Sequence, residues 1–136
     1  MNKEELLNKC IDFSVKITRL RKYLREMQHE YNIAEQIQRS GTSIGANYGE
    51  ACDGESRADF VHKLGIALKE ANETIYWLKV LYGQNLSQKK HSMSCWMMYA
   101  KYIKLSLQAL KPSKEKNKSQ ILNVKSQISK IICVAS

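Results

Sequence analysis

Apolar residues recur at alternating spacings of four and three over the first 27 positions, with no glycine or proline between them. The series consists of Leu6, Cys10, Phe13, Ile17, Leu20, Leu24 and Met27. This spacing puts every member on one stripe of an α-helix and is typical of a helix packed nearly parallel to a neighbour. A helix with such a stripe needs further helices to cover it.

Three further segments carry a stripe of the same kind. The second begins near Asn32 and ends around Asp53-Gly54, and the third extends from Ser56 to about Gly83. The fourth extends from about Ser87 to Leu110, where the single proline, Pro112, opposes continuation. The apolar face of the third segment consists of Phe60, Leu64, Ala67, Ala71, Ile75, Leu78 and Tyr82. Four long helices with short connections predict an all-α fold, an antiparallel up-down-up-down four-helix bundle over residues 1–110.

Predicted starts of three helices carry an acid three residues after a capping residue, as a capping box requires. The pairs are Asn2 with Glu5, Asn32 with Glu35, and Ser56 with Asp59.

After residue 110 the composition changes, because residues 111–136 hold six lysines and a single glutamate. We expect this basic C-terminal tail to be partly disordered, although Ile121, Val124, Ile128 and Ile131 would line a short amphipathic helix.

Composition excludes several classes of protein. The chain has 136 residues, enough for one domain, and its six glycines and one proline argue against a turn-dense β-sandwich or barrel. The four cysteines form no C-x-x-C pair for zinc or redox chemistry. The longest apolar run, residues 95–100, is far too short to span a membrane, and the N-terminal residues lack the apolar core of a signal peptide. We therefore expect a cytoplasmic protein with no membrane contact.

Three glycines recur every four residues inside the second helix, at Gly41, Gly45 and Gly49. Each glycine costs about 1 kcal/mol relative to alanine in a helix interior, so a compensating contact is expected. Glycines at this spacing form a smooth ridge that another helix can approach closely. The alternative, a phosphate-binding loop, lacks the preceding strand and the Lys-Ser or Lys-Thr that such a loop requires. The glycines are therefore predicted to be helix-packing residues.

No arrangement of side chains favours an enzyme. Glu26-x-x-His29 and Asp59-x-x-His62 each resemble half of a di-iron site, but they fall at opposite poles of the predicted bundle. We expect no metal, no cofactor and no catalytic residue.

Charged residues beside the apolar stripes are predicted to form a buried ion-pair network that fixes helix register. It consists of Arg39, Glu70 and Glu73. Four aromatic side chains would either stack on bases or pack in the core and at subunit contacts: Trp77, Trp96, Tyr99 and Tyr102.

Charge gives the clearest indication of function. The chain holds 22 Lys and Arg against 13 Asp and Glu, a net charge of +9, and the charge is segregated. Residues 16–25 hold five cations and no acid, whereas residues 34–73 hold four basic and seven acidic residues. A segregated basic face favours phosphate binding over a merely solvated surface. The candidate nucleic-acid-binding residues are Lys16, Arg19, Arg21, Lys22, Arg25, Lys101 and Lys104.

The segments FSVKITRLRKYL and AEQIQRSGTSIGANYGEACDGESRADFVHKLGIALKEANETIYWLKVL resemble the bacterial ribosomal-RNA intervening-sequence proteins. That family is related to the accessory protein of diversity-generating retroelements, which works with a reverse transcriptase and nucleic acid. The resemblance implies a four-helix bundle that assembles as a homopentamer with a basic surface, and it implies no enzymatic activity. Family motif positions without an assigned role are matched by Arg39, Ser40, Ser43, Asn47, Gly49, Glu50, Glu70 and Glu73.

Together, the residues and the resemblance predict a non-enzymatic, homo-oligomeric bundle that binds RNA or DNA through phosphate contacts with little sequence specificity. The alternative is a protein-interaction scaffold, or an accessory subunit for a nucleic-acid enzyme, whose protein partner performs the chemistry.

Overall fold

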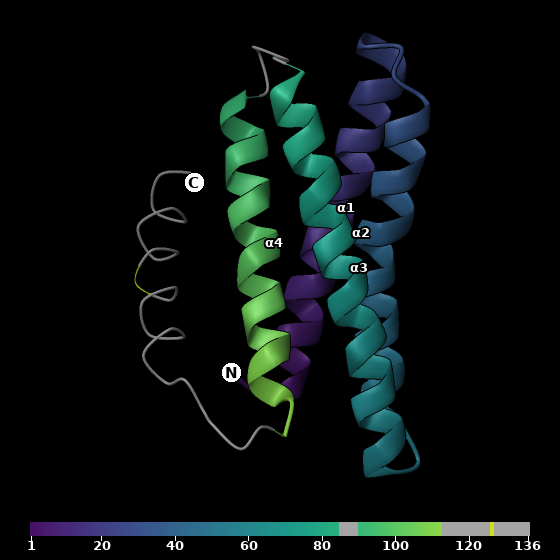
Figure 1. Cartoon of the computed structure of the whole chain (residues 1–136), viewed down its shortest axis with the longest axis vertical. Coiled ribbons are helices and arrows are strands. Elements are labelled where there is room, and N and C mark those ends of the chain that lie inside the picture. Colours follow the sequence, from purple (N-terminus) through teal and green to yellow (C-terminus); the bar gives the residue numbers. More distant parts are fainter. Residues whose placement is uncertain (85–89, 113–125, 127–136) are drawn as a thin grey trace.

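Successive α-helices run antiparallel to one another and pack side by side along their lengths (Figure 1). The computed structural model describes residues 1–84, 90–112 and 126. Over those residues the helices are α1 (Lys3–Met27), α2 (Asn32–Cys52), α3 (Arg57–Gly83) and α4 (Lys90–Leu110). The prediction of an all-α, up-down-up-down four-helix bundle is therefore confirmed.

Side-chain caps begin two of the helices as predicted. Asn2 Oδ1 accepts a hydrogen bond from the Glu5 amide at 2.7 Å, and Ser56 Oγ accepts one from the Asp59 amide at 3.1 Å. The predicted pairing of Asn32 with Glu35 is wrong, because α2 has Tyr31 at its N-cap position, with no side-chain cap bond. The Glu30 carboxylate instead accepts from the Ile33 amide, at 2.9 Å. Glu35 is thus free to bond elsewhere.

The apolar stripes meet in one core. In α1 the stripe from Leu6 to Leu24 is buried, but Met27 is 67% exposed because the helix ends at that residue. In α3 the predicted inward residue Tyr82 is 40% exposed, and Leu81 is fully buried in its place. A step of three residues from Leu78, rather than four, keeps Leu81 on the inward face of a helix with 3.6 residues per turn.

The glycines of α2 face α1. A Cβ atom added at Gly41 would lie 2.9 Å from both γ carbons of Ile17, and one added at Gly45 would lie 3.1 Å from the Cβ of Cys10. At Gly49 the nearest atom would be a methyl group of Leu7 at 3.7 Å, which is ordinary van der Waals contact. The close approach of α1 to α2 therefore depends on the absence of a side chain at Gly41 and Gly45.

The contact between α1 and α4 is the least extensive of the four packed helix pairs. Aromatic side chains of α4 bridge it: the Tyr99 ring lies 5.6 Å from the Phe13 ring, and its hydroxyl donates to the Lys9 carbonyl at 3.2 Å. Lys9 and Lys16 lie over the rings of Tyr102 and Tyr99, each with Nζ 5.7 Å from the ring centroid. Rings and cations thus close this side of the bundle.

Two expectations concern residues that are largely outside the described ranges. The predicted start of the fourth helix near Ser87 lies there, as does the tail over 111–136 apart from Lys111, Pro112 and Ser126. Within the described ranges, none of the helices combines the length and apolarity that crossing a membrane requires.

Candidate nucleic-acid interface

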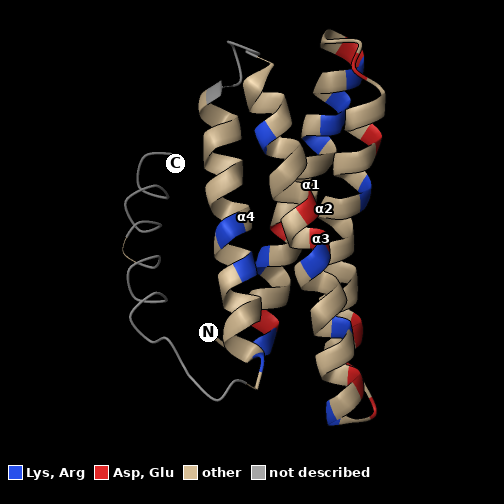
Figure 2. Ribbon diagram, viewed as in Figure 1, with Lys and Arg blue, Asp and Glu red and all other residues tan. Residues whose placement is uncertain are grey.

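Lysine and arginine residues are distributed over all of the described helices, with Arg39 the one that α2 carries (Figure 2). The seven predicted phosphate contacts fall into three groups in the structure. Two are bonded to a carboxylate of α2, three lie exposed on α1, and two line a groove between α3 and α4.

Arg21 and Arg25 both bond to Glu35. Its Oε1 lies 2.7 Å from Arg21 Nη2, 3.0 Å from Arg21 Nε and 2.8 Å from Arg25 Nη1. The hydrogen bond from Arg21, followed by the charges of the two guanidinium groups, lowers the pKa of Glu35. Arg25 also lies over the Tyr31 ring, 5.1 Å from its centroid. Because a phosphate would have to compete with this carboxylate, Arg21 and Arg25 are the weaker candidates of the seven.

Lys16, Arg19 and Lys22 are exposed, and the described residues form no ion pair with them. Lys16 points toward α4, where its ammonium lies over Tyr99. Arg19 borders a shallow groove of about 570 Å³ between α1 and α2, which we call the α1/α2 groove. The other residues that line it are small or apolar: Ile11, Ser14, Val15, Thr18, Gly45 and Ala46.

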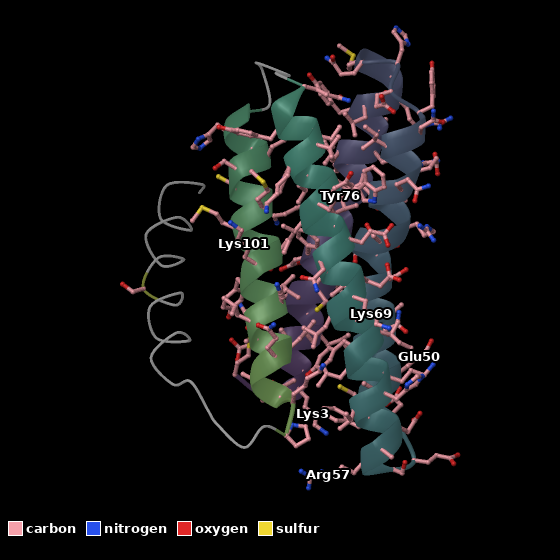
Figure 3. The ribbon with its side chains drawn as sticks, viewed as in Figure 1. Lys3, Glu50, Arg57, Lys69, Tyr76 and Lys101 are labelled. Atoms are coloured by element: carbon pink, nitrogen blue, oxygen red, sulfur yellow. The ribbon has the colours of Figure 1, made fainter. Side chains whose placement is uncertain are left out.

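Lys101 and Lys104 of α4 line a second groove, of about 400 Å³, which we call the α3/α4 groove. Its other lining residues are Asn72, Ile75, Tyr76, Lys79 and Leu105. This lining holds three cations and no carboxylate. Figure 3 labels Tyr76 on α3 and Lys101 on α4, the two helices that bound the groove.

Sequence reasoning missed Lys79 and Tyr76 as members of this site. Their positions carry a signal, because Asn72, Tyr76 and Lys79 lie at helical spacing on one face of α3. Which residues of α4 that face meets depends on how far α4 slides along α3, and the apolar pattern leaves this open.

The aromatic side chains considered for base stacking pack against the core. Trp77, Trp96, Tyr99 and Tyr102 are all partly buried there. Burial raises the pKa of the Tyr99 phenol to about 12, so the hydroxyl stays neutral. Tyr76, which lines the α3/α4 groove, is 58% exposed and is therefore better placed to stack on a base than these four partly buried rings.

The ion pair predicted to be buried lies at the surface. Arg39 Nη2 is 3.1 Å from Glu73 Oε1, but the two side chains are 66% and 35% exposed. Glu70 forms no ion pair with the described residues; desolvation and the Glu73 charge raise its pKa, while the Arg39 charge acts in the opposite direction. The buried polar link between α2 and α3 consists of two hydroxyls instead, since Thr74 Oγ1 donates to Ser40 Oγ at 3.0 Å. Long charged side chains reach the surface from these flanking positions, whereas short hydroxyls cannot.

The candidate metal ligands are not brought together in the described ranges. No cluster of three His, Cys, Asp or Glu that could hold a metal occurs there. The residues Glu26 and His29 lie at the end of α1, while Asp59 and His62 lie at the start of α3, which is the opposite end of the bundle (Figure 1). Burial raises the pKa of the Cys10 thiol to about 12, so it stays protonated and packs as a small apolar group.

Comparisons with known proteins agree with the resemblance seen in the sequence. The model of the family described as 23S rRNA-intervening sequence protein matches residues 2–106. A crystal structure at 1.70 Å of a protein with unknown function from the S23 ribosomal protein family, from Bacteroides thetaiotaomicron, superposes with a TM-score of 0.74 and 41% identity. The match covers 81% of this chain and 97% of that one. A search of curated proteins finds no significant match.

Proposed function

The chain belongs to the 23S rRNA-intervening sequence protein family, and on that basis we propose that it is a non-enzymatic, homo-oligomeric bundle that binds RNA or DNA. Binding would proceed through phosphate contacts and with little sequence selectivity. The free thiols of Cys10, Cys52 and Cys95 fit a reducing compartment such as the cytoplasm.

The observation that carries the nucleic-acid proposal is the set of exposed cations without carboxylate partners among the described residues. Lys16 and Lys22 on α1 and Lys101 on α4 belong to it, and Lys104 on α4 is half-buried but likewise forms no ion pair with the described residues. Helix α4 carries no aspartate or glutamate at all. When these side chains contact phosphates, they release the counterions condensed on the nucleic acid without first breaking an ion pair, and this release drives sequence-independent binding.

The absence of a base-reading element supports low selectivity. The described residues form no β-sheet platform, and the exposed lysines lie along straight, antiparallel helices rather than on a recognition helix that projects from the fold. Phosphate contacts orient a nucleic acid without reading its sequence.

Self-association is supported by the α1/α2 groove. Ile11 and Val15 are 51% and 45% exposed there, and Arg19 is the charged residue among those lining it. Apolar side chains exposed side by side on a helical surface are typical of a contact between subunits. A second copy of the chain on this surface would cover Arg19, so Lys16 and Lys22 become the stronger phosphate candidates of α1. The pentamer that the resemblance implies is the expected assembly.

Salt-dependent binding tests the nucleic-acid proposal. Fluorescence anisotropy with single-stranded, duplex and structured oligonucleotides should show binding that weakens steeply from 50 to 200 mM salt. The double variants Lys16→Gln/Lys22→Gln and Lys101→Gln/Lys104→Gln should each lower affinity and the salt slope. A matched control, Arg57→Gln/Lys63→Gln, removes the same charge, and Lys63 already bonds to Glu50. No binding at low salt, or equal losses in all three variants, would contradict the proposal.

Light scattering after size-exclusion chromatography tests the assembly. The native protein should elute at five times the 15.7 kDa chain mass. An Ile11→Glu/Val15→Glu variant should elute as a smaller species that still melts cooperatively. An unchanged mass would mean that the α1/α2 groove is no subunit contact.

The scaffold alternative rests on the same exposed apolar residues, Ile11 and Val15. It predicts that a protein partner stays bound to the tagged chain in a nuclease-treated lysate and is lost in the Ile11→Glu/Val15→Glu variant. Loss of every partner after nuclease treatment would favour the nucleic-acid proposal.

A further inference from the structure

We propose that the α3/α4 groove binds a single-stranded segment of nucleic acid, with one base stacked on Tyr76 and phosphates held by Lys79, Lys101 and Lys104. This inference rests on the nucleic-acid binding proposed above and adds to it a location, a strand state and a stacking residue.

The charge of the groove fits a polyanion. Three lysines line it from two helices, Lys79 from α3 and Lys101 and Lys104 from α4, and its lining includes no carboxylate. The acid nearest to these residues in the α3 sequence, Glu73, is engaged elsewhere, because it accepts hydrogen bonds from Arg39 of α2 and from Trp77. The groove is therefore a concave surface with cations on both walls, which suits a phosphate backbone that runs between the two helices.

Tyr76 supplies an aromatic surface in the same groove. Its side chain is 58% exposed although it lies next to Ile75, a buried residue that also lines the groove. Truncation of such a side chain would remove little of the core. A large exposed ring surrounded by lysines suits base stacking, because every base offers a flat π face while the lysines hold its phosphates.

The ring of Tyr76 is held in place by its neighbours. It contacts the Trp77 indole edge-to-face, with ring centroids 5.0 Å apart and an interplanar angle of 73°. The indole is fixed in turn, because its Nε1 donates to Glu73 Oε1 at 3.2 Å and Arg39 donates to the same oxygen. A ring that is held before binding loses less conformational entropy when a base stacks on it.

The strand state follows from the stacking residue. Bases inside a duplex are already stacked on one another and would have to be unpaired to reach Tyr76, whereas the bases of a single strand are free to do so. The volume of about 400 Å³ is at the small end of ligand sites and suits a single nucleotide unit rather than a duplex. An acidic peptide would satisfy the lysines but would make no use of the ring.

The test compares intact and abasic strands of equal length. Anisotropy is measured with labelled oligo-dT, oligo-U and an abasic oligomer with the same number of phosphates. Tyr76→Ala should bind the intact strands about tenfold more weakly and the abasic strand as the native protein does, while Tyr76→Phe should bind both normally. Lys79→Gln/Lys104→Gln should weaken all three. Tyr82→Ala, which removes another exposed tyrosine of α3 that does not line the groove, is the matched control and should change nothing.

The outcomes separate the two proposals. If the native protein binds neither these strands nor the duplex and structured oligonucleotides, the proposed function fails and the inference fails with it. If it binds duplexes but no single strand, the inference alone fails. If the native protein binds but Tyr76→Ala binds intact strands equally well, nucleic-acid binding stands and the groove assignment is wrong. A polyglutamate peptide that competes with oligo-dT and loses affinity equally in Tyr76→Ala would overturn the nucleic-acid occupant.

Discussion

Glu35 accepts two hydrogen bonds from Arg21, at 3.0 Å from Nε and 2.7 Å from Nη2, so a carboxylate of α2 lies over the most basic stretch of α1. Arg25 bonds to the same oxygen atom at 2.8 Å. The five cations between residues 16 and 25 therefore do not act as one surface. Lys16 lies over a ring of α4, Arg19 borders the α1/α2 groove and Lys22 is exposed, whereas the charges of Arg21 and Arg25 are partly neutralised by Glu35.

Removal of this carboxylate should strengthen nucleic-acid binding. Glu35→Gln releases the Arg21 and Arg25 guanidinium groups, so affinity at low salt should rise and the logarithmic salt slope should steepen by up to about 2. Glu50→Gln changes the charge equally at a carboxylate paired with Lys63 and serves as the control. Anisotropy over a salt series measures both variants, and equal gains in the two would mean that Arg21 and Arg25 make no phosphate contact.

Glycine-to-alanine substitutions at Gly41 and Gly65 should change the free energy of unfolding in opposite directions. Gly41→Ala gains about 1 kcal/mol of helix propensity but pushes a methyl group against Ile17, which costs about 1–3 kcal/mol. Gly65→Ala gains the same propensity in α3, where a Cβ would meet nothing within 4 Å. Urea unfolding should therefore show Gly41→Ala destabilised by about 1 kcal/mol and Gly65→Ala stabilised by about 0.5–1 kcal/mol. A stabilised Gly41→Ala would show that α1 can move away at no cost.

The buried hydroxyl pair between α2 and α3 should show energetic coupling. Thr74→Val leaves the Ser40 hydroxyl with only the Ile37 carbonyl at 3.5 Å, and should cost about 1 kcal/mol. Ser40→Ala should cost a similar amount, and the double variant less than the sum of the two. Thr42→Val is the control, because its hydroxyl bonds to the Gln38 carbonyl within α2. Additive losses in the unfolding free energy would contradict a direct bond.

The raised pKa of Glu70 should be visible in the pH dependence of stability. Desolvation, and then the Glu73 charge, raise its pKa in the folded state, so the folded protein holds a proton that the unfolded chain releases. This group therefore lowers stability as pH rises from its ordinary carboxyl value through the raised one, and the penalty remains at neutral pH. Glu70→Gln should melt higher than the native protein at pH 7 and equally at pH 3.

The neighbouring acid provides the control for that experiment. Glu73 accepts hydrogen bonds from Arg39 and Trp77, so Glu73→Gln should melt lower than the native protein at pH 7. Stabilisation by both glutamine variants would indicate general charge repulsion rather than desolvation of Glu70.

Helix number, direction and core stripes were predictable because period and capping are local. The errors arose where a side chain had a choice of partners. Glu35 stands three residues after Asn32, as a capping acid would, yet Glu30 caps the helix and Glu35 reaches across to α1. Between Leu81 and Tyr82, both of which continue a helical stripe from Leu78, only the packed bundle decides which one is buried.

The candidate site was less predictable than the fold. Lys101 and Lys104 stood out by charge, but their association with Tyr76 and Lys79 depends on the register between α3 and α4. That register is set by packing along the whole interface, and no residue pattern within either helix encodes it.

The weak seam between α1 and α4 has a consequence for motion. Helices α1, α2 and α3 pack through extensive interfaces, whereas α4 contacts α1 mainly through the Tyr99 ring and its hydroxyl. In native-state amide exchange, α4 should consequently open at lower free energy than its neighbours. A ligand that binds Lys79 and Lys104 at once would link α4 to α3 and so raise the free energy at which α4 opens.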